Sequence, residues 1–196
     1  VVVCPTGGHW VSLHWTMKNV YIGHPGYVYN AAQDVDWFFG HTYVGRAPLI
    51  QGCTTIVFEG KPIGTPDAGT FWRVISEHNV RSFFTAPTAF RAIKRDDPKG
   101  EFAKKYDLSG LRALYLAGER ADPDTINWAR DLLGVPVVDH WWQTETGYAV
   151  AANPLGIEEL PIKVGSPSVA MPGYDVQVLD EGGNQMPAGE LGAIAI

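Results

Sequence analysis

The sequence predicts an α/β fold, a mostly parallel sheet with flanking helices that is followed by the start of a small β subdomain. Apolar runs of strand length alternate with amphipathic segments of helical length, and strands separated by helices form parallel, right-handed units. After Asn153, prolines separate short stretches of alternating polarity, which indicates short strands and turns. We therefore expect residues 1–160 to form the α/β part and residues 161–196 to begin the β subdomain.

The first elements establish the alternation of helix and strand. Apolar residues at near-helical spacing predict a helix over residues 9–21, and the run at 27–29 predicts a strand. Residues 37–50 are expected to form a second helix, which Gly52 ends. The β-branched run at 54–58 predicts the next strand.

The same alternation continues through the middle of the chain. Residues 66–69 are expected to start a helix that precedes a strand at 80–84. Pro87 opens the following helix, at a position where its missing N–H costs nothing. Charged residues interrupted by proline and glycine predict a surface excursion over residues 96–105.

Two apolar runs, at 111–117 and 134–138, predict the last strands of the sheet. Between them, Asp122 is expected to cap a helix that runs to Leu133. Residues 177–183 predict a strand that enters a hairpin turn, within the β subdomain.

The composition narrows the class of ligand. The chain has 196 residues, of which 45% are hydrophobic and 18% charged, so it is expected to fold around a packed core. Its net charge of -6 contains no block of like-signed residues, which argues against nucleic acid and membrane partners and favours a small molecule. Two cysteines without metal spacing, and no apolar run near the roughly 20 residues of a membrane span, make the cytoplasm the expected location.

Polar residues follow two predicted strands at the point where each ends. Residues 139–146 place two indoles, a hydroxyl and a carboxylate after one strand, and residues 118–120 (Gly-Glu-Arg) follow another. Ligands of parallel α/β sheets bind beyond the carboxyl ends of strands, so both segments are candidate sites. The structural alternatives are a helix cap at Thr144 and Glu145, core packing of the indoles, and an ordinary turn at 118–120.

Several blocks of residues together resemble one enzyme family. Residues 139–145 match the pattern Asp-x-Trp/Tyr-Trp-Gln-Thr-Glu, and the other blocks are Gly60-Lys61-Pro62, Pro66-Asp67-Ala68-Gly69, Thr85-Ala86-Pro87-Thr88-Ala89, Asp107-Leu108-Ser109-Gly110-Leu111 and Gly118-Glu119. On these residues the chain resembles the adenylate-forming acyl-CoA synthetases, and within them the acetate- and propionate-activating ligases. The resemblance covers essentially the whole chain.

The resemblance implies a division into parts. Residues 1–160 would belong to the α/β adenylation core, and residues 161–196 would begin a β-barrel-like subdomain. Most of a glycine-rich phosphate loop, a ribose-binding aspartate and a C-terminal domain with a catalytic lysine would lie outside the chain. The chain opens without methionine and stops within an apparent strand, so we expect an incomplete piece that is inactive by itself.

The resemblance also implies a reaction. A short-chain carboxylate would attack the α-phosphate of ATP to give an acyl-adenylate and pyrophosphate, and the thiol of CoA would then take the acyl group and release AMP. ATP, Mg²⁺ and CoA are therefore the expected cofactors and co-substrates, and the parent protein is expected to be an acid–thiol ligase. Positioning and charge neutralisation are expected to dominate the catalysis.

Site residues follow from the same resemblance. Thr144 would contact the α-phosphate or the adenylate, and Glu145 would hold Mg²⁺; these are the two expected catalytic residues. The nucleotide would be bordered by Gly118, Glu119, Arg120, Asp139, His140, Trp141, Gln143 and Thr144. The acyl pocket would be lined by Phe38, Phe39, Ala117 and Trp142, with the indole of Trp142 leaving room only for a short acid.

One departure from the acetate pattern favours propionate. Arg120 stands where acetate enzymes usually have proline, and the block at 116–120 resembles the propionate-type subgroup. Phe38 and Phe39 replace smaller residues and so bear on the size of the acyl pocket. Two alternatives stay open: an acetate–CoA ligase, and a non-catalytic nucleotide-binding or interaction module in which the phenylalanines block the acid site. The expected location extends to the mitochondrial matrix if the source is eukaryotic, and the oligomeric state is left open.

Overall fold

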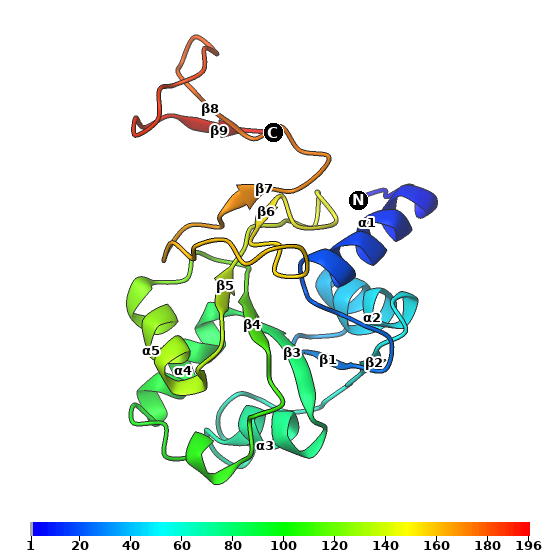
Figure 1. The fold of residues 1–196 in the computed structure, drawn as a ribbon, viewed down its shortest axis with the longest axis vertical. Helices are drawn as coiled ribbons and strands as arrows, with labels where there is room; N and C mark the ends of the chain where they lie inside the picture. The colour runs from blue at the N-terminus through cyan, green and yellow to red at the C-terminus, as the bar shows by residue number, and fades with distance from the viewer. Residues whose placement is uncertain (1) are drawn as a thin grey trace.

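A five-stranded parallel sheet forms the centre of the computed structural model, which describes residues 2–196. The strand order is β2-β1-β3-β4-β5, and each neighbouring pair is parallel (Figure 1). The strands are β1 (Val28–Ala31), β2 (Thr54–Thr55), β3 (Val80–Thr85), β4 (Ala113–Leu116) and β5 (Val137–Asp139). The predicted α/β class is confirmed.

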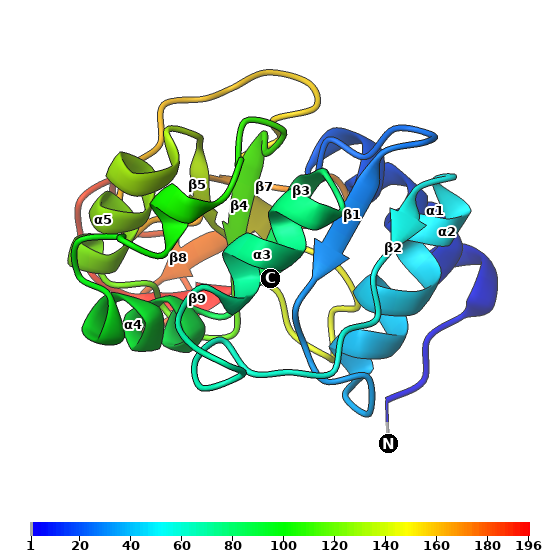
Figure 2. The ribbon, with the colours of Figure 1, turned by 90° about the horizontal axis from the view of Figure 1, so that it is seen from below.

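Helices cover both faces of the sheet. They are α1 (Thr6–Asn19), the π-helical segment η1 (Gly40–Arg46) continuing into α2 (Ala47–Ile50), α3 (Thr70–Glu77), α4 (Pro87–Asp96), the short 3₁₀ segment η2 (Ala103–Lys105) and α5 (Pro123–Leu133). Helices α1 and α2 lie on one face and α3, α4 and α5 on the other (Figures 1 and 2). The chain moves toward one edge of the sheet from β1 to β2, and toward the other edge from β2 onward. Because each crossover is right-handed, the helix of the first crossover lies on the opposite face from the helices of the later ones.

Side chains of the strands alternate between the two faces. In β4, Ala113 and Tyr115 belong to the core under α1 and α2, whereas Leu114 and Leu116 belong to the core under α3–α5. The alternation arises because successive side chains of a strand point to opposite sides. All four of these residues are buried, as expected for the centre of a parallel sheet.

The helix between the last two strands of the sheet confirms its sequence signals. The Asp122 carboxylate accepts a 2.8 Å hydrogen bond from the Thr125 N–H and so caps α5. Gly134, with φ of 65°, ends the helix in the left-handed conformation.

Several element boundaries differ from the prediction, among them those of β2 and α1. Strand β2 has only two residues, Thr54 and Thr55, because it is the edge strand of the sheet and the chain then leaves it to line a cavity. Helix α1 begins at Thr6 rather than at residue 9, so Gly7 and Gly8 are helical.

The last part of the chain forms two small antiparallel pairs. Strand β6 (Ala151–Ala152) pairs with β7 (Val169–Ala170), and β8 (Gln177–Leu179) pairs with β9 (Ala193–Ala195) in a hairpin that projects away from the sheet (Figure 1). Strand β6 precedes residue 160 and strand β7 follows it, so this pair joins the two predicted parts of the chain. The division of the chain at residue 160 stays a prediction. Within residues 2–196, no helix combines the length and apolar character of a membrane span.

Candidate functional site at the carboxyl ends of the strands

The sheet has a topological switch point between β1 and β3, where the strand order changes direction. Open α/β sheets bind ligands in the crevice that such a switch creates beyond the carboxyl ends of the strands. Two cavities open there, of about 720 Å³ and about 300 Å³, and both are lined by Gln33 and Ala86. The structure therefore offers two adjoining sites rather than one.

The smaller cavity collects residues from the ends of four strands. Its lining consists of Gln33, Trp37, Phe39, Ala86, Ala117, Gly118, Trp142, Gln143 and Thr144. Six of these were predicted site residues, and Gln33, Trp37 and Ala86 were not. Ala86 and Trp37 could have been found, because Ala86 lies in a family-like block and Trp37 precedes the predicted Phe38. Only the tertiary structure brings Gln33 to the cavity.

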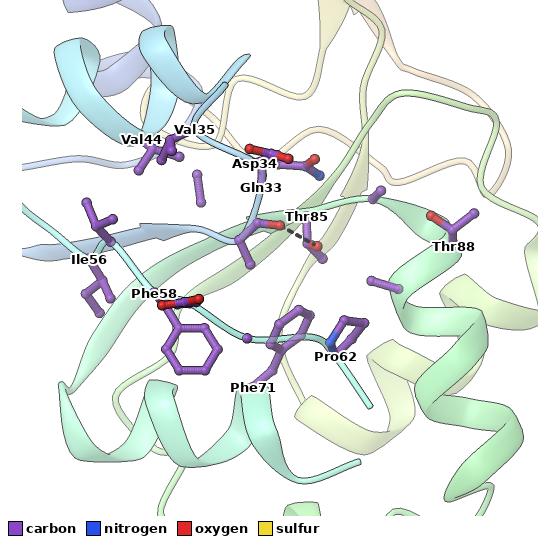
Figure 3. A pocket seen from close by; sticks show the side chains of 17 residues that line it. Gln33, Asp34, Val35, Val44, Ile56, Phe58, Pro62, Phe71, Thr85 and Thr88 are labelled. Atoms are coloured by element: carbon purple, nitrogen blue, oxygen red, sulfur yellow. Dashed lines mark hydrogen bonds between the residues drawn. The ribbon is translucent and has the colours of Figure 1, made fainter. Parts of the chain in front are cut away.

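The lining of the larger cavity mixes apolar and polar side chains (Figure 3). Ile56, Phe58 and Phe71 lie on one side, and Gln33, Asp34 and Thr85 lie opposite, with Val35 and Val44 beside Asp34. The Thr85 hydroxyl donates a 3.3 Å hydrogen bond to the Ala32 carbonyl oxygen, which joins the ends of β1 and β3. No predicted site residue lines this cavity.

Aromatic rings form the floor beneath the smaller cavity. The Trp142 ring lies 5.2 Å from the Phe39 ring and 5.4 Å from the Tyr43 ring, which it meets edge-on. Phe39 packs in turn against Phe84 at 4.3 Å. This stack fixes the indole, since each ring is held by another beneath it.

Phe38 is not among the residues that line either cavity, and its expected place in the acyl pocket stays a prediction. Its ring packs against His9 at 5.9 Å and against Trp142 at 6.4 Å, on the outer side of the indole. Phe38 and Phe39 lie at the start of a helical segment, where successive side chains diverge by about 100°. Phe39 lines the smaller cavity, and the adjacent Phe38 is turned away from Phe39.

Two glycines allow the backbone to reach this arrangement. Gly118 follows β4 with φ of 102°, a conformation that other residues rarely adopt, and lines the smaller cavity. At Gly40, a Cβ atom would lie 2.3 Å from the Asp34 carbonyl oxygen. The segment that carries Gln33 can pack against the start of η1 only because residue 40 has no side chain.

Residues 143–147 form a tight turn that carries Thr144 and Glu145. The Gln143 carbonyl oxygen accepts hydrogen bonds from Thr146 N–H at 3.2 Å and Gly147 N–H at 3.1 Å, and the Thr146 hydroxyl accepts one from Gln143 N–H at 2.9 Å. No helix follows the turn within the described residues 148–196, so the alternative of a helix cap is wrong. Thr144 lines the smaller cavity, and Glu145 is exposed beside it.

The turn after β4 contributes a charged rim. Glu119 accepts a 2.7 Å hydrogen bond from the Arg91 guanidinium of α4, and both side chains are partly exposed. Asp139, at the end of β5, accepts a 3.2 Å hydrogen bond from Ala121 N–H. Burial raises the pKa of Asp139 to about 6, although that hydrogen bond and the charge of Arg120 oppose the rise. The predicted residues Glu119, Arg120 and Asp139 thus lie on neighbouring strand ends.

His140 lies in the core, and the expectation that it borders the nucleotide stays a prediction. Its side chain is 2% exposed, with Nδ1 2.9 Å from the Leu116 carbonyl oxygen and Nε2 2.9 Å from the Tyr21 hydroxyl. Because a carbonyl oxygen only accepts, Nδ1 carries the proton and Nε2 accepts from Tyr21. Burial lowers the pKa of His140 to about 4, so the ring is neutral near pH 7.

Trp141 is half-buried and lies outside both cavities. Its backbone N–H donates to the Ala151 carbonyl oxygen at 2.9 Å, and its carbonyl oxygen accepts from Val150 N–H at 2.8 Å. The backbone of Trp141 therefore anchors the cavity-lining segment that follows it to the strand β6.

Within residues 2–196, no group of three or more histidine, cysteine, aspartate or glutamate side chains is arranged to hold a metal. Glu145 is a single exposed carboxylate next to Thr144. Mg²⁺ commonly uses one or two carboxylates together with substrate phosphates and water. The donor set therefore fits a cation that arrives with a nucleotide rather than one held by protein ligands alone.

Comparison with known proteins decides the family. The family model described as AMP-binding enzyme matches residues 3–196. The chain belongs to the AMP-binding enzyme family. Its relatives include acyl-CoA synthetase short-chain family member 3, mitochondrial, of Homo sapiens, which is 45% identical over all of this chain and 29% of its own length. The propionate–CoA ligase of Salmonella typhimurium is 43% identical over 89% of this chain and 27% of its own length.

The fold of this AMP-binding chain also matches a solved structure. The crystal structure of Brucella canis acyl-CoA synthetase superimposes with a TM-score of 0.83 at 32% identity, over 95% of this chain and 33% of that one. The resemblance inferred from residues 139–145 and the other blocks is thus confirmed at the level of family and fold. The chain spans less than a third of the length of these relatives, and the roles of its site residues stay proposals.

Proposed function

We propose that the protein containing this AMP-binding chain activates a short-chain carboxylate, propionate, with ATP and transfers it to CoA. One observation carries the proposal. The smaller cavity, of about 300 Å³, places the apolar surfaces of Phe39, Ala117 and Trp142 next to Thr144. It can therefore hold a short acyl chain with its carboxylate directed toward a phosphate at Thr144.

The reaction has two displacements. A carboxylate oxygen attacks the α-phosphorus of ATP, the bond to the β-phosphate oxygen breaks, and pyrophosphate leaves with the electron pair. The thiolate of CoA then attacks the acyl carbon of the adenylate, and AMP leaves as the thioester forms. Both steps depend mainly on holding the reacting groups in line and on stabilising charge on the phosphate.

Thr144 and Glu145 are the residues that we assign to the phosphate chemistry. The Thr144 hydroxyl would donate to an α-phosphate oxygen, and the Glu145 carboxylate would hold Mg²⁺ that accompanies ATP. When bound, Mg²⁺ supplies positive charge that neutralises the phosphates. The tight turn of residues 143–147 carries both residues, with Thr144 in the lining of the smaller cavity and Glu145 exposed next to it in the chain.

The charged rim beside this turn is the proposed nucleotide site. Gly118 offers close approach of its backbone, and Glu119, Arg120 and Asp139 lie on the adjacent strand ends. Trp141 and Gln143, which flank Trp142, complete the proposed border. His140 lies in the core, where its hydrogen bond to the Leu116 carbonyl oxygen links the end of β5 to β4.

The identity of the acid depends on the depth of the smaller cavity. The apolar surfaces of Trp142 and Phe39 in its lining favour a short chain, and the name of the Salmonella relative supports propionate over acetate. Comparison of kcat/KM for the two acids tests this choice. The alternative of a blocked, non-catalytic module is disfavoured, because Phe39 lines an open cavity rather than filling it.

The larger cavity is the proposed approach for the thiol. It meets the smaller one at Gln33 and Ala86, so a long flexible arm lying in it would bring its thiol toward an acyl group beside Ala117. The remaining partners are small molecules, and we place the protein in the cytoplasm or, in a eukaryote, in the mitochondrial matrix.

Substitution of Glu145 tests the proposed function. In the full-length protein, Glu145→Gln is expected to lower propionate-dependent pyrophosphate exchange by about a hundredfold, since removal of one charge-stabilising group commonly costs that much. Thermal unfolding is expected to stay unchanged, because Glu145 is exposed. Glu158→Gln, at an exposed acid outside both cavities, is the matched control. Full exchange activity in Glu145→Gln would refute the assigned role.

A further inference from the structure

The turn of residues 143–147 is held by a residue from much further along the chain. The Tyr174 hydroxyl donates a 2.9 Å hydrogen bond to the Thr146 carbonyl oxygen. The side chain of Thr146 meanwhile closes the turn locally, by accepting from Gln143 N–H at 2.9 Å. Thr144 and Glu145 lie in the chain between Gln143 and Thr146, so the position of Thr146 determines where Thr144 and Glu145 lie.

Tyr174 is itself well anchored. Its ring packs on Tyr148 at 4.9 Å, and its backbone N–H donates to the Met171 carbonyl oxygen at 3.2 Å. Met171 is 2% exposed, and its N–H donates to the Val150 carbonyl oxygen at 2.8 Å. Burial raises the pKa of Tyr174 to about 12, so the hydroxyl stays a neutral donor near pH 7. The phenol is therefore placed before any substrate binds.

We propose that Tyr174 is a positioning residue for the phosphate chemistry, fixing through Thr146 the turn that presents Thr144 and Glu145. The inference rests on the proposed function, which assigns these two residues to ATP and Mg²⁺. Tyr174 lines neither cavity, so it acts through the backbone and not by touching a substrate. The acid lies elsewhere, against Trp142 and Phe39. Loss of the hydroxyl is thus expected to change kcat and to leave the KM for propionate unchanged.

Tyr148→Phe provides a matched control for Tyr174→Phe. Tyr148 belongs to the same ring pair, and its hydroxyl donates a hydrogen bond of the same length, 2.9 Å, but to Pro172, outside the 143–147 turn. In the full-length protein, Tyr174→Phe is expected to lower kcat for pyrophosphate exchange by about fivefold to tenfold, the value of one hydrogen bond. Tyr148→Phe is expected to stay within about twofold. Equal losses in both variants, or a rise in the KM for propionate alone in Tyr174→Phe, would overturn the inference.

Amide hydrogen exchange without substrates separates this inference from the proposed function. The Thr146 and Gly147 amides, which bond to Gln143 within the turn, are expected to exchange faster in Tyr174→Phe than in the wild type or Tyr148→Phe. Absence of pyrophosphate exchange in the wild type would reject the proposed function, while faster amide exchange would still support the hold of Tyr174 on the turn. Unchanged amide exchange in Tyr174→Phe would overturn the inference whatever the activity.

Discussion

The two faces of the sheet are both buried but carry different chemistry. Under α3–α5, the largest buried side chains are Trp72, Phe83 and Phe90. Under α1 and α2, the core contains four tyrosines, namely Tyr21, Tyr29, Tyr43 and Tyr115, together with His140. Apolar packing specifies volume, whereas a buried hydroxyl with a hydrogen-bond partner, as in Tyr21, Tyr43 and Tyr115, also specifies direction.

This difference bears on the smaller cavity, whose aromatic floor belongs to the tyrosine-rich face. Trp142 and Phe39 pack on Tyr43, and the Tyr43 hydroxyl lies 3.0 Å from that of Thr16. Tyr115 donates a 2.6 Å hydrogen bond to the Val20 carbonyl oxygen. The core under α1 and α2, with its hydrogen-bonded hydroxyls, thus supports the site. The core under α3–α5 contributes mainly to stability.

Phe90→Ala gives the largest expected change in stability. Phe90 is 0% exposed and packs on Trp72 at 5.7 Å, away from both cavities, so its truncation is expected to lower the free energy of unfolding by about 3–5 kcal/mol. Denaturant unfolding measures the loss, and Arg95→Ala, at an exposed position of α4 outside both cavities, is the control. The preference among acids of different length is expected to stay the same. A changed preference would show that the core under α3–α5 also shapes the acid site.

Tyr21→Phe is expected to have the next largest effect. The substitution leaves the buried Nε2 atom of His140 without its donor and is expected to cost about 1–3 kcal/mol in unfolding free energy. Tyr29→Phe is a matched control, because the buried Tyr29 hydroxyl has no hydrogen-bond partner among residues 2–196. Its loss is expected to be neutral or stabilising. Similar costs for both variants would show that aromatic volume, not direction, matters on this face.

The smallest expected effect is the pH dependence contributed by Asp139. Burial raises its pKa from 3.8 to about 6 in the folded protein, so the folded state binds more protons than the unfolded state between these values. The contribution to stability is present below the lower value and is lost as the pH rises through about 6. The effect is small, since the carboxyl is only partly buried and water screens it.

Asp139→Asn is expected to remove this pH dependence, measured as the change of the denaturant midpoint between about pH 4 and pH 7. Asp107→Asn is the control, because hydrogen bonds from Ser109 lower rather than raise the pKa of the exposed Asp107. If stability fell as much in Asp139→Asn as in the wild type over this pH range, groups other than Asp139 would control the pH dependence.

Local patterns in the sequence predicted the elements but not their lengths. The cap at Asp122 and the helix end at Leu133 follow the prediction, whereas Gly134, assigned to the following strand, instead ends α5 in the left-handed conformation. Strand β2 is shorter than its β-branched run, because an edge strand pairs on one side only and a cavity draws the chain away. Strand propensity does not show whether a strand lies at the edge of a sheet or whether the chain after it lines a cavity.

The candidate site shows the same limit. The sequence identified the strand ends that carry Gly118 and Thr144, because polar residues after apolar runs mark the carboxyl edge of a parallel sheet. It did not show which neighbouring side chains face the cavity. Phe38 and His140 point away from it, owing to helical divergence in one case and strand alternation in the other.

The sequence by itself determined the family, the alternation of strands and helices, and the segments that carry the chemistry, since these depend on residue types and spacing along the chain. Tertiary structure alone brought Gln33 to the shared wall of two cavities and the Tyr174 hydroxyl to Thr146. These contacts join residues that the sequence separates, and only the packing of the sheet, its helices and the β6–β7 pair sets the distances between them.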